Sequence, residues 1–172
     1  MTNSAMLHSM LLFAAATALL FAVAHDVAVR TVPNRVSLII AAAGLGLNAL
    51  DGQSGPALFG ASLVFAGCWY CWRRGWIGGG DVKLLSACTL LVPPALVPEL
   101  ILSTAIAGAA LALFYLALAR LLPSGPTPRA TGLLRRVWRA ERRRIRRRLS
   151  LPYACAISAG VFLTLSSSAL LG

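Results

Sequence analysis

The chain has 172 residues, of which 58% are hydrophobic and only 12% are charged, whereas soluble domains carry about 25% charged residues. The charge is also uneven, because 11 of the 21 charged residues lie within residues 123–151 and the other 143 residues hold only 10. Too few charges remain to cover a water-soluble surface, which excludes a cytosolic enzyme, a nucleic-acid domain and a disordered tail. An integral membrane protein is left, and its length suits a single domain over residues 1–172.

The first half of the chain contains three apolar segments that are predicted to be transmembrane helices. Residues 5–24 give 20 mostly apolar positions, enough to cross a hydrocarbon core of about 30 Å. Residues 36–50 and 57–72 are shorter, and helix-boundary residues precede both. Asn34 is a candidate N-cap for the second segment, and a Gly-Pro pair at Gly55 precedes the third.

Three further apolar segments follow in the second half. Residues 82–97 are interrupted by two consecutive prolines beginning at Pro93, so the fourth helix is expected to end near Val92. Residues 100–119 and 153–171 are each long enough to cross a membrane. The fold class predicted is therefore all-α, a polytopic membrane bundle of six transmembrane helices.

Basic side chains alternate between the predicted connections and indicate how the helices are oriented. The connections after the first, third and fifth helices hold all 16 Lys and Arg residues, and the other two hold none. Because Lys and Arg collect in cytoplasmic loops, both termini are predicted to lie on the outer side. The basic residues are Arg30 and Arg35, then Arg73, Arg74 and Lys83, then Arg120 and the ten arginines within residues 129–148.

The basic cytoplasmic loop at residues 123–151 has a pattern of its own. Leu134, Trp138, Ile145 and Leu149 recur at helical spacing among the arginines. This pattern is typical of a basic amphipathic helix on a surface of anionic lipids, whereas the default interpretation of such a charge run is a solvated topology signal. A nucleic-acid partner is not predicted, because the loop lacks aromatic stacking platforms.

Two of the five acidic residues share a depth in this topology. Asp26 closes the first helix and Asp81 opens the fourth, so both are expected at the cytoplasmic boundary. Two carboxyl groups that approach closely hold one proton between them and can activate water, as in aspartic proteases, without a metal or cofactor. The alternative is that Asp26 pairs with Arg30 and that Asp81 is an ordinary helix N-cap.

The residues around Asp81 favour a binding role. Gly78, Gly79 and Gly80 directly precede it and offer backbone on which an extended peptide could pair. Lys83 lies on a different helix face from Asp81, and its role is left open between lipid phosphate, substrate positioning and pKa tuning.

No metal is predicted. Cys68 and Cys71 have Cys-x-x-Cys spacing, but they lie in an apolar helix without a second pair, which favours packing over zinc binding. His8 and His25 are the only histidines, so a multi-histidine site is excluded.

Three short blocks resemble the type IV prepilin peptidases, a family of intramembrane aspartyl proteases. Residues 78–85 (GGGDVKLL) are similar to the family's Gly-x-Gly-Asp signature. Residues 26–34 (DVAVRTVPN) resemble the block around its first aspartate, with Arg, Pro and Asn at the expected offsets. Residues 151–153 (LPY) with Ala156 resemble the start of its last helix, although Ala-Cys replaces the usual Gly-Pro.

This resemblance implies a peptidase of the bacterial inner membrane that removes the short basic leader from prepilin-like precursors at the cytoplasmic face. Asp26 and Asp81 map onto the catalytic pair. Long members also carry an amino-terminal domain with paired Cys-x-x-Cys motifs, so this chain resembles the short, peptidase-only form of Flp or tight-adherence pili, without methyltransferase activity.

Two other function classes stay open. A small proton-coupled transporter or channel could use the same acids, and a non-enzymatic partner of a secretion machine would need neither. The identity of the precursor and the oligomeric state do not follow from the sequence.

Overall fold

The computed structural model describes residues 3–121 and 151–171. Within these ranges the chain forms six α-helices, one short 3-10 helix and no strand, which confirms the all-α class. The elements are α1 (Asn3–Val29), α2 (Asn34–Leu50), α3 (Ser54–Arg73), α4 (Gly79–Thr89), η1 (Pro94–Leu96), α5 (Val97–Leu121) and α7 (Tyr153–Leu171).

Two segments are long and apolar enough to cross a membrane by length and composition, namely Asn3–Val29 and Pro94–Leu121. Shorter apolar helices cover Asn34–Leu50 and Tyr153–Ser168. The six transmembrane spans and the outward orientation of both termini stay predictions.

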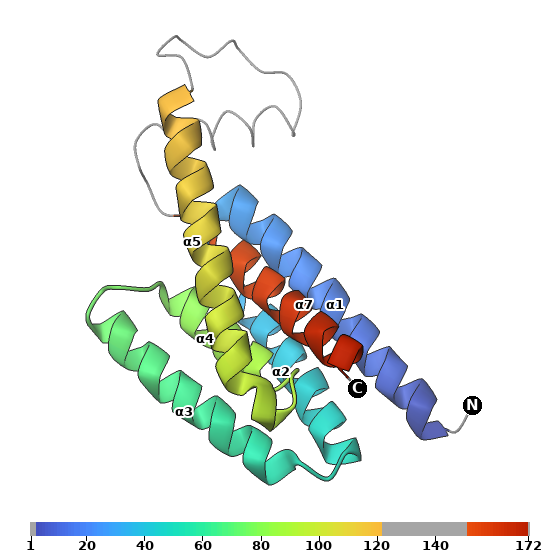
Figure 1. Cartoon of the computed structure of the whole chain (residues 1–172). Coiled ribbons are helices and arrows are strands. Elements are labelled where there is room, and N and C mark those ends of the chain that lie inside the picture. The colour runs from blue at the N-terminus through green and yellow to red at the C-terminus, as the bar shows by residue number, and fades with distance from the viewer. Residues whose placement is uncertain (1–2, 122–150, 172) are drawn as a thin grey trace.

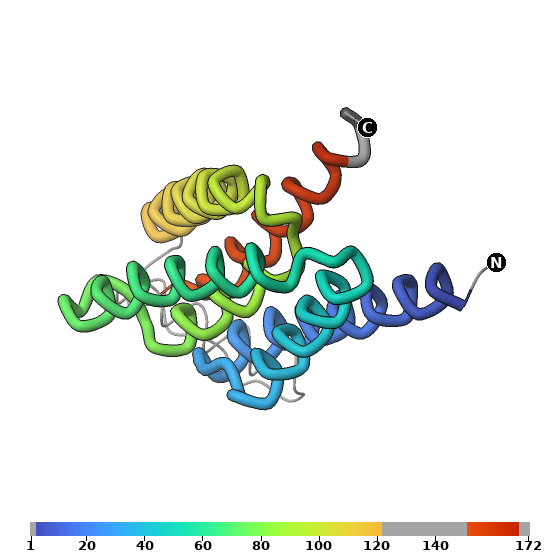
Figure 2. The backbone as a smooth tube through the Cα atoms, turned by 90° about the horizontal axis from the view of Figure 1, so that it is seen from below, coloured from blue at the N-terminus to red at the C-terminus, as the bar shows by residue number. Residues whose placement is uncertain are grey.

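The helices run back and forth, so that their connections gather at two ends (Figure 1). One end holds the 30–33 and 74–78 connections and the start of α7, and the other holds the turn after α2 and η1 (Figure 1). α4 is central and packs against α2, α3 and α7. Figure 2, which views the bundle from below, shows α5 and α7 together on one side and α1 and α2 on the other.

The end of α4 differs from the sequence prediction. The helix ends at Thr89 rather than near Val92, and the chain then turns through buried residues before the two prolines. Asn48 of α2 donates hydrogen bonds to the carbonyls of Leu90 (2.7 Å) and Gly44 (2.8 Å). This buried amide supplies a partner for a carbonyl that the helix no longer satisfies, which allows the earlier ending.

The predicted N-cap of α2 is wrong. Pro33 occupies the N-cap position, and Asn34 is the first helical residue and makes no capping hydrogen bond. Its side-chain oxygen instead accepts a hydrogen bond of 3.0 Å from the Lys83 ammonium of α4. A contact between segments 49 residues apart has replaced the local one.

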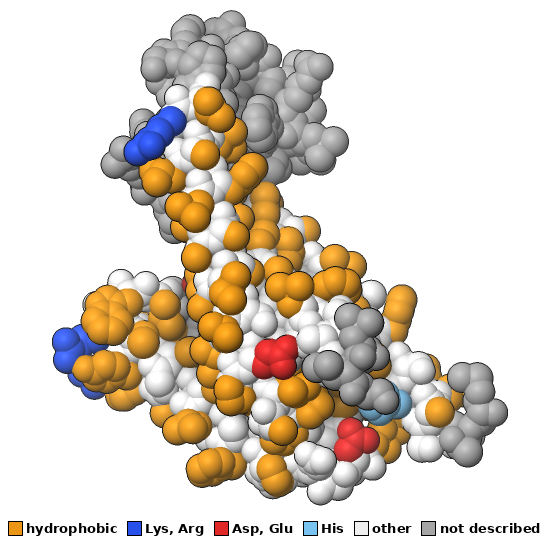
Figure 3. Space-filling view, viewed as in Figure 1, with side chains coloured by type: hydrophobic (Ala, Val, Ile, Leu, Met, Phe, Trp, Pro, Cys, Tyr) orange, Lys and Arg blue, Asp and Glu red, His pale blue; other side chains and the backbone are white. Residues whose placement is uncertain are grey.

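Hydrophobic side chains cover much of the face seen in Figure 3, and several polar side chains are buried inside the bundle. Phe13, Phe59 and Phe162 are more than 70% exposed, whereas Thr104 and Thr164 are buried. A soluble domain would show the reverse distribution. The central core contains small and branched residues, among them Ala22, Ile40, Leu84, Cys88, Leu100 and Ile157.

The basic helix predicted within residues 123–151, and with it the contact to anionic lipids, lies almost entirely outside the described residues.

Candidate active site

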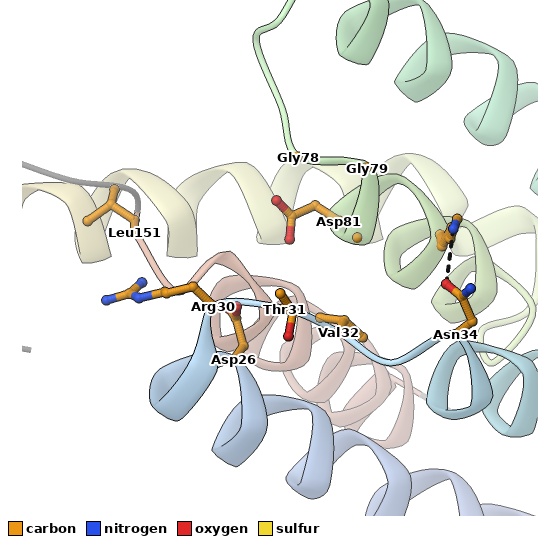
Figure 4. Close-up of a pocket in the computed structure, with 11 residues that line it drawn as sticks. Asp26, Arg30, Thr31, Val32, Asn34, Gly78, Gly79, Asp81 and Leu151 are labelled. Atoms are coloured by element: carbon orange, nitrogen blue, oxygen red, sulfur yellow. Dashed lines mark hydrogen bonds between the residues drawn. The ribbon is translucent and has the colours of Figure 1, made fainter. Parts of the chain in front are cut away.

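A cavity of about 430 Å³ opens at the end of the bundle where the 30–33 connection passes the start of α4 (Figure 4). Both predicted acids line it, as do the three glycines and Lys83. The structure therefore brings every predicted site residue to one cavity. Its full lining is Asp26, Arg30, Thr31, Val32, Asn34, Gly78, Gly79, Gly80, Asp81, Lys83 and Leu151.

Asp26 lies in the last turn of α1 and is only 6% exposed. One of its carboxylate oxygens accepts a hydrogen bond of 3.1 Å from the Ala154 backbone N–H. Ala154 is the second residue of α7, where backbone N–H groups have no acceptor within their own helix. The start of α7 thus supplies a fixed donor, with the positive end of a helix dipole, to a buried carboxylate.

Asp81 is half-buried in the first turn of α4, ahead of the apolar part of that helix. Its pKa is raised from 3.8 to about 6. Burial is the largest cause, the nearby charge of Asp26 is the second, and a hydrogen bond with the Gly78 backbone opposes both. The two carboxyls are therefore close enough to influence each other's ionisation and sit in different environments.

The three glycines differ in how much room a side chain would have at each position. Gly78 is the N-cap of α4, and a Cβ there would lie 2.9 Å from the Asp81 carboxylate. A Cβ on Gly79 would lie 3.3 Å from the Trp72 indole nitrogen. Gly80 faces Val32 at 3.7 Å, an ordinary contact distance. Gly79 and Gly80 are helical, so the side-chain-free extended backbone is limited to Gly78.

Two cations flank the acids. In Figure 4 the Arg30 guanidinium lies on one side of the aspartates, and the hydrogen bond between Lys83 and Asn34 lies on the other. The Arg30 guanidinium also approaches the Tyr115 ring of α5, 6.0 Å from its centroid. The Arg30 backbone N–H donates to the Asp26 carbonyl at 2.8 Å, which closes the end of α1.

The described residues contain no group of three or more His, Cys, Asp or Glu side chains that could hold a metal ion. Cys68 and Cys71 are free thiols on α3.

Sequence reasoning missed the Ala154 amide as a partner of the acid. Pro152 marks the start of the last helix and so signals free N–H groups there, but no local pattern says that they face a residue 128 positions earlier.

Fold and cavity together define a helical membrane protein with two carboxyl groups at one polar pocket. Residues 13–113 match the type IV leader peptidase family, a range that includes both aspartates and the glycines. The chain therefore belongs to that family, and its membership indicates a protease. No curated protein and no solved structure gives a significant match.

Proposed function

We propose that this protein is a multi-pass aspartic endopeptidase of the bacterial inner membrane that removes the short basic leader from Flp-like prepilins at the cytoplasmic face. Asp26 and Asp81 are the catalytic pair in this proposal. The observation that carries it is the pair of carboxyls at one cavity in different environments: Asp81 has a pKa raised to about 6, and Asp26 accepts a backbone N–H.

The different environments of the two carboxyls support different catalytic roles for Asp26 and Asp81. An amide N–H can only donate, so its contact suits Asp26 as an unprotonated acceptor. The proton of the pair then resides on Asp81, whose environment disfavours the charged form. Asp26 takes a proton from water as the water oxygen attacks the peptide carbonyl, and Asp81 gives its proton to the carbonyl oxygen. As the tetrahedral intermediate collapses, Asp26 gives the proton that it took from water to the leaving amine nitrogen, Asp81 takes a proton back from a hydroxyl of the intermediate, and the C–N bond breaks.

Substrate binding is assigned to Gly78, Gly79, Gly80 and Lys83. Amide N–H groups in the first turn of a helix are available to an extended peptide, and the glycines keep side chains away from them. Lys83 lies beyond Asp81 at the cavity wall, where its ammonium is oriented by Asn34.

Co-expression with candidate small prepilin precursors tests the proposal, with the new amino terminus read by mass spectrometry. Asp26→Asn and Asp81→Asn should each abolish cleavage while the protein stays inserted in the membrane. Asp51→Asn is the matched control, because Asp51 is an exposed acid at the other end of the bundle, and it should cleave at the unaltered rate. Cleavage retained by either pocket variant would remove that residue from the mechanism, and no cleavage of any precursor would favour the transporter alternative.

A further inference from the structure

The 30–33 segment connects α1 to α2 and forms one wall of the cavity. It begins at Arg30, whose φ of 62° is unfavourable for a residue with a side chain. It then passes the start of α4, where Val32 lies 3.7 Å from the position of a Cβ on Gly80. A segment in this conformation keeps its place only if its neighbours hold it.

His25 supplies such a hold. Its Nδ1 lies 2.6 Å from the Thr31 carbonyl oxygen. A carbonyl cannot donate, so the proton of this hydrogen bond belongs to Nδ1, which selects one tautomer of the neutral ring. The ring also lies against Phe21 one turn earlier on α1, with centroids 5.8 Å apart. The imidazole therefore packs against a residue of its own helix and is hydrogen-bonded to the 30–33 segment that follows the helix.

We propose that His25 is a positioning residue of the aspartate pocket, which holds the Thr31 carbonyl and so keeps the 30–33 segment against the start of α4. This inference rests on the proposed function and deepens it. His25 adjoins Asp26 in sequence. One turn of α1 therefore carries both a catalytic acid of the proposed mechanism and the residue that holds the 30–33 segment, which lines the cavity with Asp81. Without the hydrogen bond, Val32 is free to move away from Gly80 and the cavity widens.

Disulfide trapping measures the position of the segment without any substrate. The spacing of 3.7 Å between Val32 Cβ and a Cβ on Gly80 matches the Cβ separation of disulfides, about 3.5–4.5 Å. A protein carrying Val32→Cys and Gly80→Cys should form this cross-link rapidly under mild oxidation, and mass spectrometry of the linked peptides quantifies it. Adding His25→Leu should slow the reaction at least about fivefold, since a hydrogen bond that restrains the segment is lost.

His25→Asn is the matched variant. Asn and Leu have nearly the same shape, but the Asn amide places a donor close to the position of Nδ1. Adding His25→Asn to the cysteine pair should therefore restore most of the cross-linking rate, whereas a purely steric role would predict the same rate for both variants.

Cleavage assays without the added cysteines complete the test. His25→Leu should lower kcat/KM about tenfold, the order expected for one hydrogen bond, and His25→Asn should recover most of that loss. His8→Leu is the control on the same helix, about 26 Å from His25 at 1.5 Å per residue, and should change kcat/KM less than about twofold.

Equal cross-linking rates with His25 and with His25→Leu would overturn the inference. Because the trapping needs no substrate, it decides the role of His25 even if the unaltered protein cleaves no precursor, a result that would overturn the proposed function instead.

Discussion

The two ends of α4 meet the preceding helices in opposite ways. At its end, a Cβ on Gly44 would lie 2.6 Å from the Leu90 carbonyl, Asn48 bonds that carbonyl, and the residues of the following turn are buried. At its start, Gly80 makes only an ordinary contact of 3.7 Å, and a cavity with acids and cations separates the elements. One end of the helix is thus anchored by close packing, while the other borders an open cavity.

The largest expected effect is at the anchored end. Gly44→Ala places a methyl group against backbone that cannot move away, and should cost about 2–3 kcal/mol or more of unfolding free energy. Unfolding in mixed dodecyl maltoside and SDS micelles, followed by circular dichroism, measures it. Gly67→Ala is the control, because nothing lies within 4 Å of its added Cβ, and its stability should equal or slightly exceed that of the parent. Equal stabilities for the two variants would contradict the anchoring.

The next effect is on activity at the open end. Gly78→Ala should displace the Asp81 carboxylate, which lies 2.9 Å from the added Cβ, and lower kcat about 100-fold by misplacing a reacting group. Because the displaced atom ends a side chain rather than a backbone, the unfolding transition should stay near that of the parent. Gly80→Ala meets no close atom, so it should fold normally and raise KM if the peptide lies along the glycines. A Gly78→Ala protein with full activity would mean that the position of Asp81 does not limit the reaction.

A smaller, graded effect is expected from pH. Asp81 has a pKa raised from 3.8 to about 6, so the folded protein binds more protons than the unfolded chain between these values. Its contribution to stability is full below pH 3.8 and is lost as the pH rises through about 6. In the proposed mechanism kcat/KM should also fall above about pH 6, because Asp81 then lacks the proton that the mechanism assigns to it.

Asp81→Asn is the control for the stability profile, since an amide does not titrate. This variant should lack the loss of stability between about pH 4 and 6 that the parent shows. An unchanged slope in the variant would assign the titration to another group.

The smallest expected effect is at the edge of the cavity. Lys83→Met removes an exposed hydrogen bond to Asn34 and should change stability by less than about 1 kcal/mol. Its KM for precursor should rise if the ammonium contacts substrate, whereas Arg35→Met, on the same end but outside the cavity lining, should leave KM unaltered. Identical KM values for both variants would remove Lys83 from substrate binding.

Most of the fold could be predicted from the sequence because its helices follow apolar runs bounded by proline, glycine and charge. The two errors both arose where a distant side chain replaced a local signal. α4 ends early because Asn48 satisfies the Leu90 carbonyl, and Asn34 is no cap because Lys83 takes its oxygen. Propensity and capping patterns describe a segment and its neighbours in sequence, and neither contact is local.

The candidate site shows the same contrast between local patterns and contacts of distant residues. The sequence by itself determined which residues are candidates for the chemistry, because Asp26 and Asp81 lie at the ends of apolar segments, and the two predicted crossings between them return the chain to the same side. Only the tertiary structure decided that these acids are unequal. The start of α7 donates to Asp26, the burial of Asp81 raises its pKa, and His25 hydrogen-bonds the Thr31 carbonyl of the segment that lines their cavity. Charge, hydropathy and helix length follow from residues that are close in sequence, whereas the environment of a carboxyl depends on which helices pack around it.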